Sequence, residues 1–286
     1  MWIPTLYFVE GIPYFLVNNV SVLMFAKMGV PNGQMALFTS LLYLPWTLKF
    51  LWSPFVDIIK TKRWWIITMQ IIMSIAFVVQ ALTMPHPSAE SIAAGSTPMS
   101  LFSFTLILFV FAAFASATHD IAADGFYMLA QSQSSQAAFV GVRSTFYRLA
   151  NVFGNGVIVA VAGLLETRTG NIPLAWQLTI GGSGILLTGL TLYHTFAIPK
   201  PESDVPNIQE DSGNKVAEIF EGFGRTVTTY FKKPGVWLAI IFMLCYRLPE
   251  AFLIKMCTPF LVAAREAGGL CLLYTSPSPR DGLLSR

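Results

Sequence analysis

Four charged side chains stand inside long apolar stretches of this sequence. Glu10 lies in the first stretch, Arg148 in the fifth, and Arg247 and Glu250 in the seventh. A charge at the middle of a membrane helix costs about 2.5 to 3.5 kcal/mol on insertion scales. Such residues hold helices together through ion pairs, or they line an aqueous cavity in which arginines bind an anion and a carboxylate carries a proton. Four charges on three separate segments favour the cavity.

Polar residues recur at helical spacing on the face of Glu10 and again on the face of Arg148. Arg247 and Glu250 are three residues apart and are therefore adjacent on a helix surface. These patterns predict a polar path through otherwise apolar segments. The side chains that we expect to line this substrate and proton pathway are Glu10, Tyr14, Asn18, Arg148, Asn151, Arg247 and Glu250.

A second group, His119, Asp120 and Asp124, ends the fourth apolar stretch. The spacing of His119 and Asp124 also occurs in some acyltransferases, which leaves a membrane acyltransferase as an alternative. On a continuous helix, however, these two side chains point about 140° apart. The group is interpreted as a proton relay or a gate at the inner surface, with an ordinary helix terminus as the other interpretation.

A third group runs from Lys49 to Asp57 and is followed by Lys60, Lys62 and Arg63. It joins the second apolar stretch to the third. Asp57 is expected to pair with a basic side chain across the inner surface, so that Lys49 and Asp57 belong to a gate. A solvated helix end beside basic residues is the alternative interpretation.

The elements that position these residues are membrane helices. Of the 286 residues, 54% are hydrophobic and only 12% are charged, which excludes a water-soluble domain. A helix needs about 20 apolar residues to cross the bilayer. Seven candidate spans follow, at about 3–26, 35–56, 64–84, 100–120, 137–164, 175–197 and 236–261.

The basic residues orient these spans, because lysine and arginine are enriched on the cytoplasmic side. With the amino terminus inside, the basic residues on the outer side are only Lys27, Arg168 and Arg265. The sequence therefore predicts an amino-terminal six-helix bundle over residues 1–198, a cytoplasmic linker over 199–235, and the first helix of a second bundle over 236–270. We expect a multi-pass protein of the inner membrane.

Two further observations limit the prediction. The three cysteines show no disulfide or metal-binding spacing, and no basic patch interleaved with aromatics suggests nucleic acid, so no metal, cofactor or nucleic-acid partner is expected.

The segment from Cys271 to Asp281 resembles a translated sequencing adapter. We therefore expect residues 271–286 to be non-native and the native sequence to be cut near Leu270.

Five motifs together resemble the major facilitator superfamily. They begin at Glu10 (Glu-Gly-Ile-Pro), Lys49 (Lys-Phe-Leu-Trp-Ser-Pro-Phe-Val-Asp), His119 (His-Asp-Ile-Ala-Ala-Asp), Tyr147 (Tyr-Arg-Leu) and Tyr246 (Tyr-Arg-Leu-Pro-Glu-Ala-Phe). Within the superfamily the chain is similar to the AmpG-type muropeptide permeases and the related acetyl-coenzyme A transporters. His119 departs from the glutamine expected in the permeases.

The resemblance implies an all-α fold of twelve membrane helices in two bundles, of which this chain holds about seven, and transport by alternating access. It also implies a proton-coupled transporter of an anionic solute, with a muropeptide first and acetyl-coenzyme A as the alternative substrate. An acyltransferase or a non-transporting scaffold in the membrane would belong to another class. The expected partners are the anionic solute, protons and the lipid bilayer.

Overall fold

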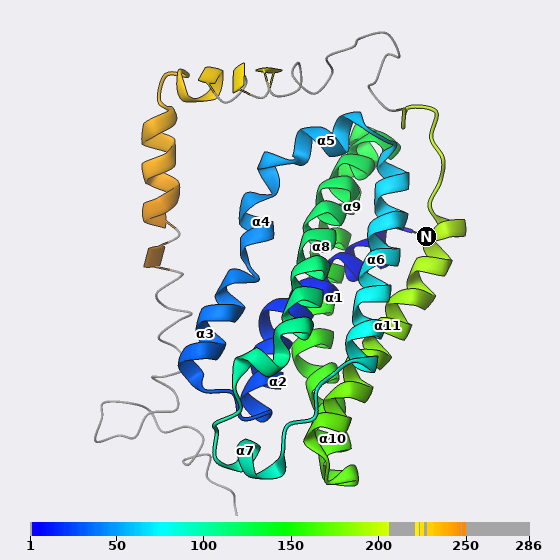
Figure 1. Ribbon diagram of the computed structural model, residues 1–286. Coiled ribbons are helices and arrows are strands. Elements are labelled where there is room, and N and C mark those ends of the chain that lie inside the picture. The colour runs from blue at the N-terminus through cyan, green and yellow to red at the C-terminus, as the bar shows by residue number, and fades with distance from the viewer. Residues whose placement is uncertain (1, 206–220, 223, 226–227, 247, 250–286) are drawn as a thin grey trace, which may run out of the picture. The chain divides into compact units, whose positions relative to one another are not determined.

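The computed structural model is built of helices, and its described residues include no strand (Figure 1). The structure describes residues 2–205, 221–222, 224–225, 228–246 and 248–249. For Asp57 and Ile58 it describes only the backbone. The chain divides into two units, Met1–Ser212 and Gly213–Arg286. The described part of the second unit contains a short apolar helix, Val236–Tyr246.

The first unit carries the long helices. In chain order its elements are α1 (Ile3–Phe15), η1 (Leu16–Val20), α2 (Ser21–Lys27), α3 (Asn32–Leu41), α4 (Leu44–Leu48), η2 (Lys49–Leu51), α5 (Ser53–Ile58), α6 (Lys62–Leu82), α7 (Ala89–Ala93), η3 (Met99–Phe102), α8 (Ser103–Ala130), α9 (Gln133–Val152), η4 (Phe153–Ile158), α10 (Val159–Thr169) and α11 (Ile172–Ala197).

Four stretches of the described residues are long and apolar enough to cross a membrane. The first joins α1, η1 and α2, and the last joins α9, η4 and α10. Helix α11 covers the predicted sixth span and is not among these four. The four stretches are Ile3–Lys27, Lys62–Leu82, Met99–Ala130 and Gln133–Thr169, and they match the predicted spans at 3–26, 64–84, 100–120 and 137–164.

The candidate span over residues 35–56 is not one continuous helix. The chain there bends between α3, α4, η2 and α5, which form a stepped path along one side of the bundle (Figure 1). Pro45 and Pro54 lie in the first turns of α4 and α5, where proline is tolerated because the first N–H groups of a helix need no partner. The breaks place Lys49 in a short 3₁₀ turn. Of the predicted seventh span, residues 250–261 lie outside the described residues.

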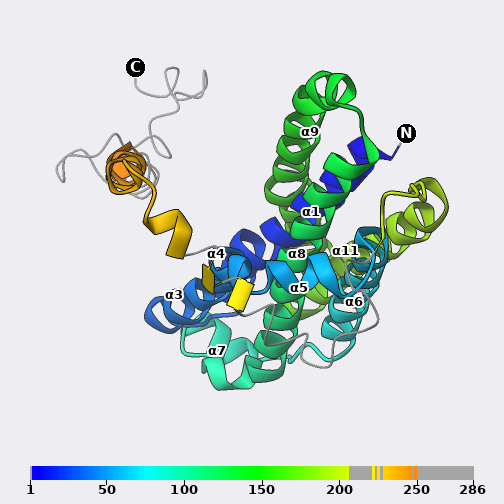
Figure 2. The ribbon, with the colours of Figure 1, turned by 90° about the horizontal axis from the view of Figure 1, so that it is seen from above.

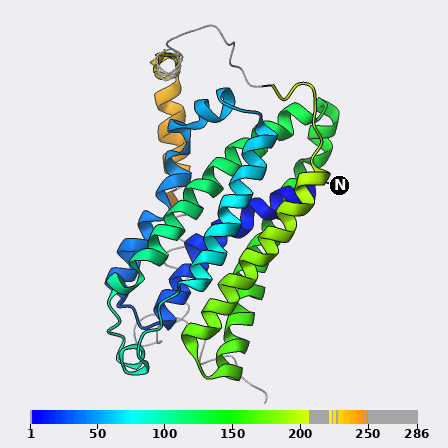
Figure 3. The same cartoon turned by 45° about the vertical axis from the view of Figure 1, so that its right-hand side comes forward.

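Helix α6 packs against both α8 and α11, while α1 packs against α9 and α8 (Figures 2 and 3). The interior between them is aromatic: the ring centroids of Phe25 and Phe102 are 5.4 Å apart, and Phe109 lies 6.1 Å from Phe25. Large apolar side chains such as Ile185 and Phe196 are exposed instead. A bundle with an apolar outer surface is suited to lipid, where helices satisfy their own backbone groups.

Two small residues bring α1 close to α9 and η4. A Cβ atom added to Gly11 would lie 2.6 Å from the Cβ of Ala150, and one added to Gly154 would lie 2.8 Å from the Cβ of Phe15. Small residues allow membrane helices to approach in this way. The contact therefore depends on the absence of side chains at Gly11 and Gly154.

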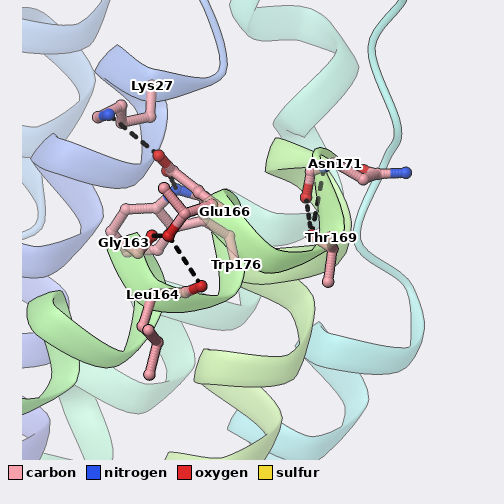
Figure 4. A network of polar contacts seen from close by, with 8 residues as sticks. Lys27, Gly163, Leu164, Glu166, Thr169, Asn171 and Trp176 are labelled. Atoms are coloured by element: carbon pink, nitrogen blue, oxygen red, sulfur yellow. Dashed lines mark hydrogen bonds and ion pairs between the residues drawn. The ribbon is translucent and has the colours of Figure 1, made fainter.

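One end of the bundle is closed by a polar network around Glu166 of α10 (Figure 4). Its carboxylate accepts hydrogen bonds from Lys27 Nζ at 3.0 Å and from the buried Trp176 Nε1 at 2.9 Å. Gly170 ends α10 with a φ of +63°, in the left-handed region that glycine adopts most readily, and the Asn171 side chain caps α11. The network joins α2, α10 and α11.

At the other end, the segment that follows α11 returns to the start of α6. The Asp204 carboxylate accepts hydrogen bonds from the backbone N–H groups of Lys62 at 2.7 Å and Arg63 at 3.0 Å. Arg63 in turn donates to the backbone oxygens of Thr195 and Ile198. A carboxylate at a helix amino terminus interacts favourably with the helix dipole. Asp204 thus fixes residues 199–205 to the bundle.

Replacing Asp204 by alanine is expected to destabilise the protein by about 1 kcal/mol, the usual effect of losing a cap. Thermal unfolding in detergent measures this as a fall in Tm of about 2 to 4 °C. Glu202→Ala is the control, since Glu202 is exposed and forms no hydrogen bond with the described residues. Equal Tm values for the two variants would contradict the capping role.

Gly154→Ala is expected to cost about 1 to 3 kcal/mol, because the new methyl group overlaps Phe15 and forces α1 away from η4. Gly156→Ala provides the matched control in the same segment, where an added Cβ meets no atom within 4 Å. The same thermal measurement compares the two. A Gly154→Ala protein as stable as the Gly156→Ala protein would show that the close approach is dispensable.

Candidate functional site

Asp124 of α8 lies at the centre of an ionic cluster. It forms an ion pair with Arg143 of α9 and accepts a hydrogen bond from the Tyr7 hydroxyl of α1 at 3.1 Å. One carboxylate therefore joins three helices. Pairing of this kind removes much of the cost of placing a charge inside a membrane.

Two tyrosine rings hold the guanidinium group of Arg143. Its Cζ lies 4.3 Å from the ring centroid of Tyr7 and 4.5 Å from that of Tyr127. The two rings meet edge to face, with centroids 6.0 Å apart, and the Tyr127 hydroxyl donates to the backbone oxygen of Gln136. Cation–π contacts on two sides fix the guanidinium plane. Arg143 is thus oriented by both charge and stacking.

Glu10 lies in the same cluster without a cation of its own. Its electrostatic neighbours are Asp120, Asp124 and Arg143. Its Oε2 atom is buried and accepts no hydrogen bond from the described residues. A carboxyl group beside two other carboxyl groups, with one oxygen unpartnered, is the least compensated charge of the cluster.

Asp120, one turn before Asp124 on α8, forms an ion pair with Lys49 of η2. The next residues of the same broken segment also contact α8, since Trp52 Nε1 donates to Thr118 Oγ1 at 3.1 Å. The predicted gate residue Lys49 therefore pairs with the predicted residue Asp120. Asp57 is the other predicted gate residue, and its side chain lies outside the described residues.

A cavity of about 450 Å³ opens beside this cluster. Arg143 and Glu10 give it one group of each charge sign, and Tyr147 provides a further hydroxyl group. The volume is within the range of small-molecule sites. The lining residues are Tyr7, Glu10, Val140, Arg143, Ser144 and Tyr147.

A second polar group, built on two histidines, lies largely enclosed between helices. Gln70 of α6 bonds to His119 Nε2 of α8 at 2.9 Å with its amide nitrogen, and to His194 Nδ1 of α11 at 3.0 Å with its amide oxygen. His194 Nε2 lies 2.9 Å from the Thr5 hydroxyl of α1. His119 Nδ1 is buried and has no partner among the described residues. This histidine–glutamine chain connects four helices.

Helix α8 therefore directs its predicted residues to two sides. His119 faces Gln70, whereas Asp120 and Asp124 face the cation partners Lys49 and Arg143. This separation agrees with the angle that the helical spacing predicts, and it leaves His119 and Asp124 without the mutual contact that an acyltransferase pair needs.

The other predicted residues lie in different surroundings. Arg148 and Asn151 of α9 are exposed, and Arg148 forms no ion pair with the described residues. Asn18 donates to the backbone oxygen of Tyr14 at 3.1 Å, and Tyr14 packs edge to face against Trp46. Arg247 and Glu250 lie outside the described residues. The site residues as a set stay a prediction.

Arg143, Tyr127, Gln70 and His194 were not identified from the sequence. Arg143 lies within the predicted span 137–164, so the rule that singled out Arg148 also applied to it. Gln70 and His194 are polar residues in apolar stretches, a weaker signal because a neutral side chain needs only one or two hydrogen bonds. Among the described residues, no three His, Cys, Asp or Glu side chains are grouped to hold a metal ion.

Comparison with known proteins identifies relatives over most of the chain. It is 25% identical over 265 residues to the anhydromuropeptide permease of Escherichia coli K12, which covers 89% of this chain and 47% of the permease. An uncharacterized protein of Haemophilus influenzae is 21% identical over 262 residues, with coverages of 89% and 55%. One from Schizosaccharomyces pombe is 30% identical over 152 residues, with coverages of 50% and 28%. The chain spans about half the length of the permease.

The sequence profile of the family described as acetyl-coenzyme A transporter 1 matches residues 2–153, more than half of the chain. This region contains α1 to α9 and the ionic cluster of Glu10, Asp120, Asp124 and Arg143. The relatives are a permease and a transporter family and not enzymes, and together with the apolar helices they support a multi-pass membrane protein. The chain belongs to the acetyl-coenzyme A transporter family.

Proposed function

We propose that this transporter moves an anionic solute across the inner membrane together with a proton, by alternating access in a fold of the major facilitator type. The observation that carries the proposal is the charge count of the ionic cluster. Three carboxyl groups, Glu10, Asp120 and Asp124, face two cations, Lys49 and Arg143. Among the described residues, the cluster holds one carboxyl group more than its cations neutralise, and a proton supplies the missing charge.

Glu10 is the carrier of that proton in the proposal. Asp120 and Asp124 each have a cation partner, while Glu10 has an unpartnered oxygen and borders the cavity. When Glu10 is protonated, it neither attracts Arg143 nor repels an anion in the cavity. Arg143 can then bind the anionic solute there, so that the proton and the solute bind together.

The Lys49–Asp120 pair acts as the gate. It joins the broken segment around η2 to α8, and the bends on both sides of η2 allow Lys49 to withdraw without unwinding a long helix. Ion pairs that form in one state and break in another are common switching elements. The basic residues Lys60, Lys62 and Arg63 near this end support a cytoplasmic location for it and for the amino terminus.

A muropeptide is the first candidate for the anionic solute, because the match to the anhydromuropeptide permease covers 89% of the chain. Acetyl-coenzyme A is the second, because the family profile matches residues 2–153. Both solutes are anionic, so Arg143 and Arg148 suit either. Right-side-out and inverted vesicles from cells that express the gene distinguish them by uptake of labelled anhydromuropeptide or acetyl-coenzyme A, with and without a pH gradient.

Glu10→Gln is expected to abolish the stimulation of uptake by a pH gradient, because the amide neither takes up nor releases a proton. Exchange of solute across vesicles without a gradient should persist, since the glutamine imitates the protonated carboxyl group. Glu90→Gln, which changes an exposed carboxylate in the short helix α7, serves as the control and should leave uptake unchanged. Full gradient stimulation in the Glu10→Gln protein would refute the proton carrier.

Lys49→Asp is expected to reduce uptake at least about tenfold, because it places two carboxylates against one another inside the bundle. The double variant Lys49→Asp with Asp120→Lys restores the opposite charges in reversed order and should regain most of the uptake. Protein amounts in the membrane are measured in parallel. If the double variant is as inactive as the single one while both are present at normal levels, the pair is not the gate.

A further inference from the structure

One residue of the segment between Lys49 and Asp57 has no part in the gate described above. Trp52 stands at the joint between η2 and α5, and its backbone angles, φ −113° and ψ 0°, lie outside the helical region. Its N–H donates to Lys49 at 3.3 Å and its carbonyl accepts from Phe55 at 3.0 Å, so one short turn lies on each side. Pro54 has no N–H group that could continue η2 into α5 as a regular helix. Hinges absorb changes of backbone angle at joints of this kind.

The side chain at this joint is held by helix α8. Trp52 Nε1 donates to Thr118 Oγ1 at 3.1 Å, and its ring packs on Phe114 with centroids 5.3 Å apart. The Thr118 hydroxyl donates its own hydrogen to the backbone oxygen of Phe114 at 2.8 Å. Its oxygen is therefore left to accept a hydrogen bond, and the indole N–H is a donor only. The two groups match, and the membrane offers no water to replace either partner.

Two contacts of different kinds thus join the segment around η2 to α8. Lys49, three residues before Trp52, forms the ion pair with Asp120, two residues after Thr118. The ion pair depends on the charge of Asp120, whereas the contacts of Trp52 are neutral. A change of charge at Asp120 weakens the first contact and leaves the second in place. The segment can then turn about Trp52 while it stays attached to α8.

We propose that Trp52 is the anchored hinge of the gate and holds the segment on α8 so that Lys49 returns to Asp120 after each opening. The proposal rests on the gate described above and adds a positioning residue that does not line the cavity at Glu10. Without the anchor, Lys49 has more positions to occupy and meets Asp120 less often. The hinge acts on the closing of the gate and not on the binding of the solute.

The state of the Lys49–Asp120 pair can be measured in purified protein without transport. A paired ammonium group reacts slowly with an amine-reactive ester, because only a free, unprotonated amine attacks the ester. Mass spectrometry gives the rate of modification at Lys49, with Lys27, which is paired with Glu166, as the internal reference. Trp52→Leu is expected to raise the rate at Lys49 about tenfold and to leave the rate at Lys27 unchanged.

Two milder variants test the hydrogen bond itself. Trp52→Phe keeps a ring on Phe114 and loses the N–H donor, and Thr118→Val removes the acceptor with nearly the same shape. Each is expected to raise the rate at Lys49 about threefold. Combined, they should do no more than either alone, because both remove the same bond. Effects that multiply in the double variant would contradict the anchor.

Phe50→Leu is the matched control, since Phe50 lies in η2 beside Lys49 and its side chain is exposed. It should leave Lys49 as slow to react as in the unchanged protein. Equal rates at Lys49 in Trp52→Leu and Phe50→Leu would overturn the proposal. A rise of the same size at Lys49 and Lys27 in Trp52→Leu would overturn it too, because that result indicates a general loosening of the bundle.

Uptake separates the hinge from the transport function on which it rests. In vesicles, Trp52→Leu is expected to lower kcat about tenfold and to keep KM within about twofold, because the hinge does not line the cavity. A raised KM with unchanged kcat would count against the hinge. If the unchanged protein takes up neither anhydromuropeptide nor acetyl-coenzyme A, the proposed solutes fail, while the rates at Lys49 in purified protein still decide for or against the hinge.

Discussion

The interior of a bilayer offers no water to solvate a charge, and the first unit is organised by that constraint. Its ionic cluster draws groups from α1, α8, α9 and the turn η2, so each ion pair also fixes the distance between two elements. Helix α8 carries both paired carboxylates and is the common member. A change in the protonation or pairing of one group therefore alters the forces on every element that meets α8 at this level.

Helix α8 also separates two kinds of polar chemistry. On one side Asp120 and Asp124 face cations, next to a cavity, and on the other His119 faces neutral partners in an enclosed interior. Adjacent residues on one helix thus serve different neighbours because each residue turns the side-chain direction by about 100°. The side beside the cavity is suited to changes of charge, while the enclosed side is suited to holding α6, α8 and α11 in place.

Much of this arrangement could be predicted from the sequence, because the cost of charge in an apolar helix marks Glu10, Asp120 and Asp124 without knowledge of the fold. The apolar runs likewise predicted four of the spans. The sequence pattern does not show which charged side chains pair with one another. Arg143 and Arg148 look alike in sequence, yet only Arg143 meets Asp124, since that depends on the packing of α9 against α1. The division of the second span into α3, α4, η2 and α5 could not be predicted from hydropathy, which does not register how far prolines interrupt a helix.

The Gln70 carboxamide has a donor at one end and an acceptor at the other, with a histidine against each. Rotating the amide by half a turn exchanges the two ends, and each ring must then move its own proton to the opposite nitrogen to stay bonded. The tautomer of His119 consequently dictates that of His194, across three helices and without any net charge. The two imidazole rings therefore change tautomer together, and neither ring can do so alone while both stay bonded to Gln70.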